Sequence, residues 1–218
     1  MDTLKTVLSE ARKELTYKDK VRESTYRDLR KATSLSKQAI LLIHQRRLKE
    51  AEKFVEKARK TISRVNDLSA THPSIIYCGL YSAALQEYSE ANIFLKLVQE
   101  SRFITPKEIN VTSNDYVLGL ADVIGECRRS ALDALREGDT KKSEQYLRTM
   151  DQIYIELTAM DESYMLVPGL RRKCDVARKI IEITRGDITQ EIRRNELEKH
   201  LRQFEKYAKK QGINSKTR

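Results

Sequence analysis

The first 72 residues of this chain contain neither glycine nor proline, and this feature restricts its fold more than any other. Apolar residues recur along the stretch at intervals of three and four, which places them on one face of an α-helix. They are Leu4, Leu8, Ala11 and Leu15, then Leu29, Ala32, Leu35, Ala39, Leu42 and Ile43. The pattern predicts one helix over residues 2–46, about 65 Å long at 1.5 Å per residue. Such a helix outruns the core of a small monomer, which favours a long bundle or an oligomer.

Glycine, proline and capping residues divide the rest of the chain. Thr105-Pro106-Lys107-Glu108 has the pattern of a capping box and predicts the start of a short helix. Longer helices are expected over 48–68, from Ser74 to Glu100, over 114–137, and from Asp139 or Thr140 to about 160. Pro168-Gly169 separates these from a sixth helix that ends at Gly186, and a seventh runs from Asp187 to about 211. No segment alternates cleanly as a strand, so the sequence predicts an all-α fold. We interpret residues 1–211 as a single helical domain and residues 212–218 as a flexible C-terminal tail.

The chain is strongly basic. Lysine and arginine outnumber aspartate and glutamate by 42 to 32, which gives a formal net charge of +10. A polyanionic partner is expected for such a protein, with nucleic acid first and an anionic membrane surface second. The longest aliphatic run, Ala39 to Ile43, is far too short to span a membrane, and the first residues have no signal-peptide pattern. Three widely spaced cysteines (Cys78, Cys127 and Cys174) favour buried reduced thiols and a cytoplasmic location over a disulfide framework.

Two of the expected helices each carry a pair of carboxylates one turn apart. The residues Leu80, Ala83, Glu87, Glu90, Phe94 and Leu97 follow one another at alternating intervals of three and four, and so form one stripe. Glu87 and Glu90 therefore take positions where the pattern calls for apolar side chains, and burying an unpaired carboxylate is costly. In a later helix Asp122 and Glu126 lie one turn apart, with Gly119 and Gly125 beside them.

Carboxylates from two adjacent helices can hold Mg²⁺ or Mn²⁺, which prefer oxygen ligands. The alternative is a set of solvated acidic faces, because the same spacing occurs in the pairs Glu10/Glu14, Asp19/Glu23 and Glu52/Glu56. The sequence contains no GxSxG, Walker, GxGxxG or HExxH motif, which excludes the enzyme classes that depend on them. Spacing alone does not decide between a metal site and a solvated surface.

Two segments that contain these carboxylates resemble the translin/TRAX family, where TRAX is translin-associated factor X. They are LQEYSEA (Leu85 to Ala91) and DYVLGLADVIGECRR (Asp115 to Arg129), which match the EYxEA and YxxGxADxxGE patterns of TRAX in the same order. The likeness extends to the Gly138-Asp139 break, to GLRRKCDVARKIIEITRGD (Gly169 to Asp187) and to YRDLRKATSLSKQAILLIH (Tyr26 to His44), and it covers most of residues 20–190. The resemblance implies a seven-helix translin-like bundle with a long first helix. It also implies a closed, shell-like oligomer, typically an octamer, with acidic sites facing an internal cavity.

Within the family, TRAX is the ribonuclease-bearing branch, and its acidic residues fall on Glu87, Glu90, Asp122 and Glu126 of this chain. Translin has an apolar residue in place of Asp122, so the chain resembles TRAX at this position. It departs from TRAX in lacking a long basic N-terminal extension and an insertion between the third and fourth helices. These departures leave open whether it assembles with itself or needs a translin-like partner subunit.

We therefore expect a divalent-metal-dependent endoribonuclease that acts on RNA, single- or double-stranded, and also binds single-stranded DNA. Glu87, Glu90, Asp122 and Glu126 would be its catalytic residues and the ligands of Mg²⁺ or Mn²⁺. Arg129 would hold a phosphate near the metal, while Arg30, Lys31 and Lys37 would line the RNA path. One alternative is a translin-like shell that binds single-stranded nucleic acid without cutting it. Another is a structural bundle whose basic last helix serves oligomerisation or a membrane surface.

Overall fold

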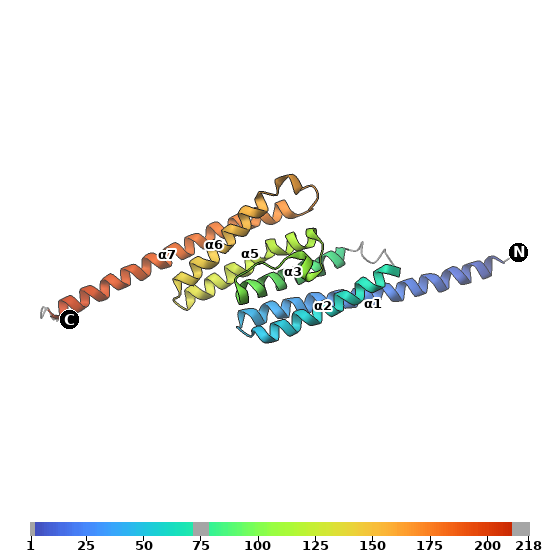
Figure 1. Cartoon of the computed structure of the whole chain (residues 1–218), viewed down its shortest axis with the longest axis horizontal. Helices are drawn as coiled ribbons and strands as arrows, with labels where there is room; N and C mark the ends of the chain where they lie inside the picture. Colours follow the sequence, from blue (N-terminus) through green and yellow to red (C-terminus); the bar gives the residue numbers. More distant parts are fainter. Residues whose placement is uncertain (1–2, 72–78, 211–218) are drawn as a thin grey trace. The chain divides into compact units, whose positions relative to one another are not determined.

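The computed structural model describes residues 3–71 and 79–210, and within these ranges the protein is built from helices alone. The helices are α1 (Leu4–His44), α2 (Leu48–Thr71), α3 (Gly79–Glu100), α4 (Pro106–Ile109), α5 (Ser113–Arg136), α6 (Thr140–Thr158), the short 3-10 helix η2 (Asp161–Ser163) and α7 (Leu170–Lys210) (Figure 1). The predicted all-α fold with a long first helix is confirmed. None of the helices in the described ranges contains an apolar stretch of the length that a membrane span requires.

The chain divides into two compact units. The first consists of Met1–Val123 and Ser163–Leu170, and the second of Ile124–Glu162 and Arg171–Arg218. The boundary falls inside α5, so this helix contributes its first half to one unit and its second half to the other. A single domain over residues 1–211 stays a prediction, and the predicted tail at 212–218 lies outside the described residues.

The core of the first unit lies where α1, α2 and α3 pack together. Leu29 of α1, Val65 of α2 and Ala84 of α3 are completely buried in one cluster. Six of the buried positions on α1 follow a spacing of three and four, namely Thr25, Leu29, Ala32, Ser36, Ala39 and Ile43, and Ile40 and Leu42 beside them are buried as well. This is the apolar face that the sequence predicts, because a stripe with helical spacing is buried when other helices cover it.

The same stripe continues toward the start of α1, where its residues are exposed. Leu4, Leu8 and Leu15 keep the three-and-four spacing, yet between 59% and 73% of each residue is accessible to solvent. The first unit covers only the later turns of α1, in agreement with the expectation that this helix outruns its own core. An apolar helical face left exposed in this way is typical of a surface that another chain covers.

The predicted end of a helix at Gly186 is wrong, because α7 runs without a break from Leu170 to Lys210. The helix continues because buried residues lie on both sides of the glycine: Thr184 is fully buried and Ile188 is 2% exposed. Burial of a large aliphatic side chain contributes about 1.5–3 kcal/mol, which exceeds the cost of about 1 kcal/mol for a glycine within a helix. The described ranges still hold seven α-helices, since the short α4 is one of them.

The capping box at the start of α4 is confirmed. The Thr105 hydroxyl oxygen accepts a hydrogen bond from the Glu108 backbone N–H at 3.3 Å, and the Glu108 carboxylate accepts one from the Thr105 N–H at 2.7 Å. These reciprocal bonds satisfy two backbone donors that have no partner within the helix. For α3, the residues from Ser74 to Cys78 that were predicted to begin it lie outside the described ranges.

Candidate functional site

Gly119 brings α5 into direct backbone contact with α3 inside the first unit. A Cβ atom on this residue would lie 2.7 Å from the Gln86 carbonyl oxygen, 2.7 Å from the Ser89 Cβ and 3.0 Å from the Glu90 backbone nitrogen. No side chain fits at such distances, so only glycine permits this approach of the two helices. The close approach of α3 thus explains why residue 119 is a glycine. Gly125 has no atom within 4 Å of its corresponding position, so close packing does not explain that glycine.

Two of the predicted carboxylate residues lie on the turns next to this contact. Glu90, on the turn of α3 that Gly119 touches, is buried, with 8% of the residue exposed. Asp122 is half-buried, and it lies one turn beyond Gly119 on a neighbouring part of the α5 surface. Glu126 is also half-buried, a further turn along the same helix and within the second unit.

Glu87 has a cationic partner from another helix. The Lys37 ammonium nitrogen on α1 lies 3.2 Å from the Glu87 Oε1 atom on α3, with the two side chains 63% and 27% exposed. The structure thus joins a lysine predicted to line an RNA path to a glutamate predicted to bind metal. This pairing could not be inferred from the sequence, because the two residues are 50 positions apart.

The donor types at these positions fit a hard divalent cation, since all four predicted ligands are carboxylates. Their arrangement is not that of a complete metal site. Among the residues that the structure describes, no three Asp, Glu, His or Cys side chains form a group that could hold a metal ion. Metal binding by Glu87, Glu90, Asp122 and Glu126 therefore stays a prediction based on the chemistry of the donors.

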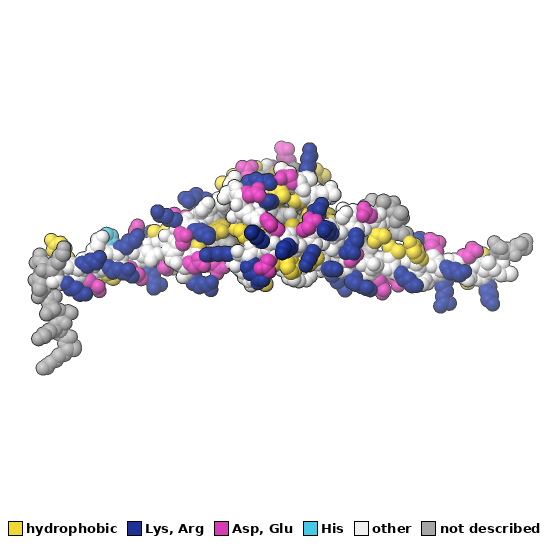
Figure 2. Space-filling model, turned by 60° about the horizontal axis from the view of Figure 1, so that its bottom comes forward, with side chains coloured by type: hydrophobic (Ala, Val, Ile, Leu, Met, Phe, Trp, Pro, Cys, Tyr) yellow, Lys and Arg dark blue, Asp and Glu magenta, His cyan; other side chains and the backbone are white. Residues whose placement is uncertain are grey.

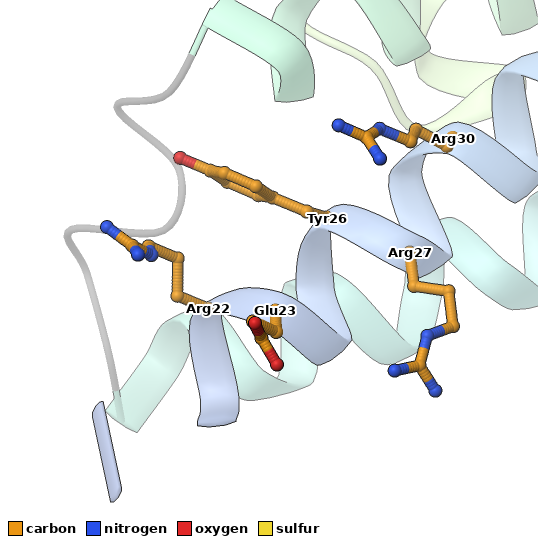
Figure 3. Close-up of a pocket in the computed structure, with 5 residues that line it drawn as sticks. All are labelled: Arg22, Glu23, Tyr26, Arg27 and Arg30. Carbon is orange, nitrogen blue, oxygen red and sulfur yellow. The ribbon is translucent and has the colours of Figure 1, made fainter. Parts of the chain in front are cut away.

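The residues predicted to contact RNA lie on different surfaces. Arg30 lines a pocket of about 450 Å³ on α1 together with Arg22, Glu23, Tyr26 and Arg27 (Figure 3). Lys31, on another side of the same helix, lines a larger hollow of about 670 Å³ beside residues of α2. Arg129 is exposed on the part of α5 that belongs to the second unit. Figure 2 shows lysine and arginine side chains interspersed with acidic ones, so the positive charge on this face is spread out.

Sequence reasoning missed Arg128, the neighbour of Arg129. Within the second unit its guanidinium donates hydrogen bonds to the Ile180 carbonyl oxygen at 3.2 Å and to the Thr184 hydroxyl at 2.9 Å. It also lies 3.8 Å from the Asp187 carboxylate. Arg128 therefore joins α5 to α7, and this role depends on contacts more than 50 residues away. The basic pair Arg128-Arg129 was the only signal in the sequence.

Asp115 is a second residue that the sequence analysis left without a role. It is buried at 5% exposure, and its carboxylate accepts hydrogen bonds from the Ser82 hydroxyl and from the Thr112 hydroxyl, the latter at 2.8 Å. The Asp115 N–H donates back to the Thr112 oxygen at 3.2 Å. This network fixes the first turn of α5 against α3, and so helps to set where Gly119 meets that helix.

The two cysteines in the described ranges, Cys127 and Cys174, are free and buried. Burial is the main reason that the pKa of the Cys127 thiol is raised to about 12, and the nearby Glu126 carboxylate acts in the same direction. A thiol with this pKa stays protonated at neutral pH and is a poor nucleophile. The prediction of buried reduced thiols is confirmed for these two residues, whereas Cys78 lies outside the described ranges.

The fold and the two acidic segments together define a class: an all-α bundle of long helices with carboxylates on neighbouring turns of α3 and α5. The model of the Translin family matches residues 20–182, and the chain belongs to this family. An uncharacterized protein of Methanocaldococcus jannaschii is 32% identical to it over 194 residues, which are 88% of this chain and 85% of that protein. The family resemblance noted in the sequence is thereby confirmed.

Solved structures support the same assignment. The crystal structure of AfC3PO is 35% identical, with a TM-score of 0.75, and the match covers 84% of this chain and 96% of that one. The structure of an AfC3PO–duplex RNA complex matches at 36% identity and a TM-score of 0.74, over 84% of this chain and 95% of the other. The crystal structure of apo-NeC3PO, at 21% identity and a TM-score of 0.76 over 88% and 100% of the two chains, supports the fold alone.

Proposed function

We propose that this protein binds RNA as part of an oligomer and cleaves it as a divalent-metal-dependent endoribonuclease of the TRAX type. Membership of the Translin family, the similarity to a protein solved with duplex RNA and the net charge of +10 support RNA binding. The nuclease proposal rests on the contact at Gly119, because the two helices that bear Glu90 and Asp122 touch there.

In this proposal Glu87, Glu90, Asp122 and Glu126 would hold Mg²⁺ or Mn²⁺ through carboxylate oxygens. A bound divalent ion of this kind activates water and neutralises charge on phosphate oxygens. Lys37 orients Glu87 through their ion pair, and its exposed ammonium is within reach of a phosphate that approaches along α1. Arg129 is exposed and would bind a further phosphate.

The chemistry of the products provides a direct test, because attack by water leaves a 5′-phosphate whereas attack by the RNA 2′-hydroxyl leaves a cyclic phosphate. End-labelled RNA should be cut in Mg²⁺ or Mn²⁺, remain intact in EDTA and yield 5′-phosphate ends. Asp122→Asn should lower the cleavage rate at least about a hundredfold, since even loss of an outer partner of a metal ligand costs about 10–100-fold. RNA affinity in EDTA should stay close to that of the wild type.

Asp133→Asn is the matched control for that variant. Asp133 lies on the same helix, and its carboxylate forms an exposed ion pair with Arg136 at 3.3 Å, outside the proposed site. Its substitution should leave the cleavage rate unchanged. Cleavage that persists in EDTA, or an Asp122→Asn protein that cuts like the wild type, would exclude the proposed nuclease site.

The second candidate function is a translin-like protein that binds single-stranded nucleic acid without cutting it. The pairing of Glu87 with Lys37 favours this alternative, because an ammonium occupies one predicted ligand. The lack of a three-residue metal-binding group in the described ranges points the same way. RNA and single-stranded DNA that are bound in EDTA and remain uncut after long incubation with Mg²⁺ and Mn²⁺ would establish this function.

We further propose that the chain assembles into a closed homo-oligomer of the octameric kind in the cytoplasm, with a translin-like partner subunit as the alternative. The exposed face formed by Leu4, Leu8 and Leu15 supports assembly, because it continues a stripe that is buried further along α1. Light scattering on the purified chain tests this directly. A monomer at micromolar concentration that becomes an oligomer only with a second subunit would favour the partnered assembly.

A further inference from the structure

One face of α1 carries an aromatic ring between two guanidinium groups. Arg22, Tyr26 and Arg30 are spaced by four residues, which places them side by side along the helix. Figure 3 shows the Tyr26 side chain extending between those of Arg22 and Arg30, while Glu23 and Arg27 point away from it. Together these five residues line the pocket of about 450 Å³. Tyr26 is half-buried, whereas both flanking arginines are exposed.

This combination has the chemistry of a site for a nucleotide. A flat aromatic ring stacks against a nucleobase, and exposed guanidinium groups bind phosphate oxygens. The described residues of the lining include three arginines and one glutamate, so their charge favours an anion. The Arg22 guanidinium donates a hydrogen bond of 2.7 Å to the Asp19 carboxylate, which offsets part of the charge of this arginine. The volume is within the range of pockets that hold ligands of nucleotide size.

The pocket lies on the same side of α1 as the proposed catalytic region. Lys37 is eleven residues after Tyr26, which is close to three full helical turns, so the two side chains leave the helix on the same face. At 1.5 Å per residue they are roughly 16 Å apart along the axis. Lys37 in turn contacts Glu87 of α3. A strand of a few nucleotides whose base rests on Tyr26 would therefore reach Lys37 and Glu87.

We propose that Tyr26, flanked by Arg22 and Arg30, is a clamp for one unpaired nucleotide that aligns a single strand of RNA along α1 toward Glu87. The inference rests on the proposed RNA-binding function and deepens it by naming the form of RNA that the site takes. The clamp selects unpaired nucleotides because the bases of a duplex are stacked on one another and leave no free face for the ring.

The first test measures binding in EDTA, without metal, so that cleavage plays no part. The probes are a short fluorescent oligouridylate and a blunt RNA duplex of equal length. Tyr26→Ala should weaken binding of the single strand by between about fivefold and a hundredfold, the range for loss of one base–aromatic stack, and leave duplex binding unchanged. Tyr26→Phe should bind both like the wild type, because its ring keeps the stacking surface.

Arg12→Ala is the matched control for charge on the same helix. Arg12 is exposed on α1 and is not part of the pocket lining. Its removal should change binding of the two probes equally and only slightly. Arg30→Ala should weaken binding of the single strand more than Arg12→Ala does. Far-ultraviolet circular dichroism checks that each variant keeps the helical content of the wild type.

The second test observes the stack itself. The chain contains no tryptophan, so Tyr26→Trp introduces the only indole fluorophore. Its emission should be quenched as the oligouridylate binds, with a midpoint equal to the dissociation constant from the first test. Tyr17→Trp, at an exposed position on the same helix, should show no such quenching.

The two tests separate failure of the clamp from failure of RNA binding as a whole. Unchanged emission of Tyr26→Trp while the oligouridylate binds with wild-type affinity would overturn the clamp and leave the proposed function standing. Equal weakening of both probes by Tyr26→Ala would also overturn it, since the ring would then not distinguish unpaired from paired nucleotides. A wild-type protein that binds neither probe, or prefers an acidic polypeptide to both, would overturn the clamp and the proposed function together.

Discussion

The Lys37 ammonium on α1 lies 3.2 Å from the Glu87 carboxylate on α3. The side chains are 63% and 27% exposed, and an ion pair as accessible as this contributes at most about 1 kcal/mol to stability. Either partner can therefore exchange the other for a ligand at little cost. For a protein proposed to bind both RNA and a divalent cation, the pair connects the two functions, because phosphate competes for Lys37 and metal for Glu87.

Lys37→Ala should separate the role of this lysine in stability from its role in binding. Urea denaturation should show a loss of less than about 1 kcal/mol. The slope of the logarithm of RNA affinity against the logarithm of salt concentration should decrease in magnitude by about one, since one phosphate contact is removed. Lys49→Ala, an exposed lysine on α2, is the control. A salt dependence equal to that of the wild type would show that Lys37 does not contact phosphate.

Gly119→Ala should be destabilising, by about 1–3 kcal/mol, because the new methyl group would meet the Gln86 carbonyl oxygen and the Ser89 Cβ at 2.7 Å. In the proposed nuclease, the resulting shift of α5 away from α3 should also slow RNA cleavage. Gly125→Ala is a matched control on the same helix, where nothing lies within 4 Å of the added atom. That variant should gain about 0.5–1 kcal/mol. Equal effects of the two substitutions on denaturation would contradict the close contact.

Gly186→Ala should raise the thermal stability, because α7 is continuous there and the added Cβ atom meets nothing within 4 Å. A gain of about 1 kcal/mol corresponds to roughly 2–4 °C in the melting temperature of a protein of this size. Gly138→Ala should have the opposite sign, since Gly138 has a φ of +81° that a residue with a side chain rarely adopts. Both are measured by thermal melting, and a lower melting temperature for Gly186→Ala would argue for a break in α7.

The raised pKa of Cys127 predicts a stability that falls at alkaline pH. The thiol has an ordinary pKa of 9.0 and a folded-state pKa of about 12, so above pH 9 the unfolded chain releases a proton that the folded chain retains. The contribution of this thiol is fully present below pH 9 and is lost progressively as the pH rises toward 12. Denaturation of the wild type and of Cys127→Ala at pH 8 and at about pH 10 isolates this effect. The difference between the two proteins should shrink at the higher pH; a constant difference would refute the shift.

Several features of the protein were determined by local sequence. The absence of glycine and proline before Pro73 predicts α1 within two residues at either end, because helix propensity and the spacing of apolar residues act over a few turns. The capping box at Thr105 and Glu108 acts over three residues and was equally visible. The acidic segments from Leu85 and from Asp115 indicated the family, which the comparisons confirm. The ligand roles of Glu87, Glu90, Asp122 and Glu126 remain predictions.

Other features were decided only when distant parts of the chain met. Gly186 has the local signature of a helix end, yet α7 continues past it because Thr184 and Ile188 are buried on either side. The ion pair of Lys37 with Glu87 and the contact of Gly119 with α3 depend on which helix faces which, and a periodic pattern cannot specify that. Local sequence sets where helices begin, how long they run and which face is apolar. Contacts between helices far apart in the chain set which side chains meet, because burial and close packing outweigh local propensity.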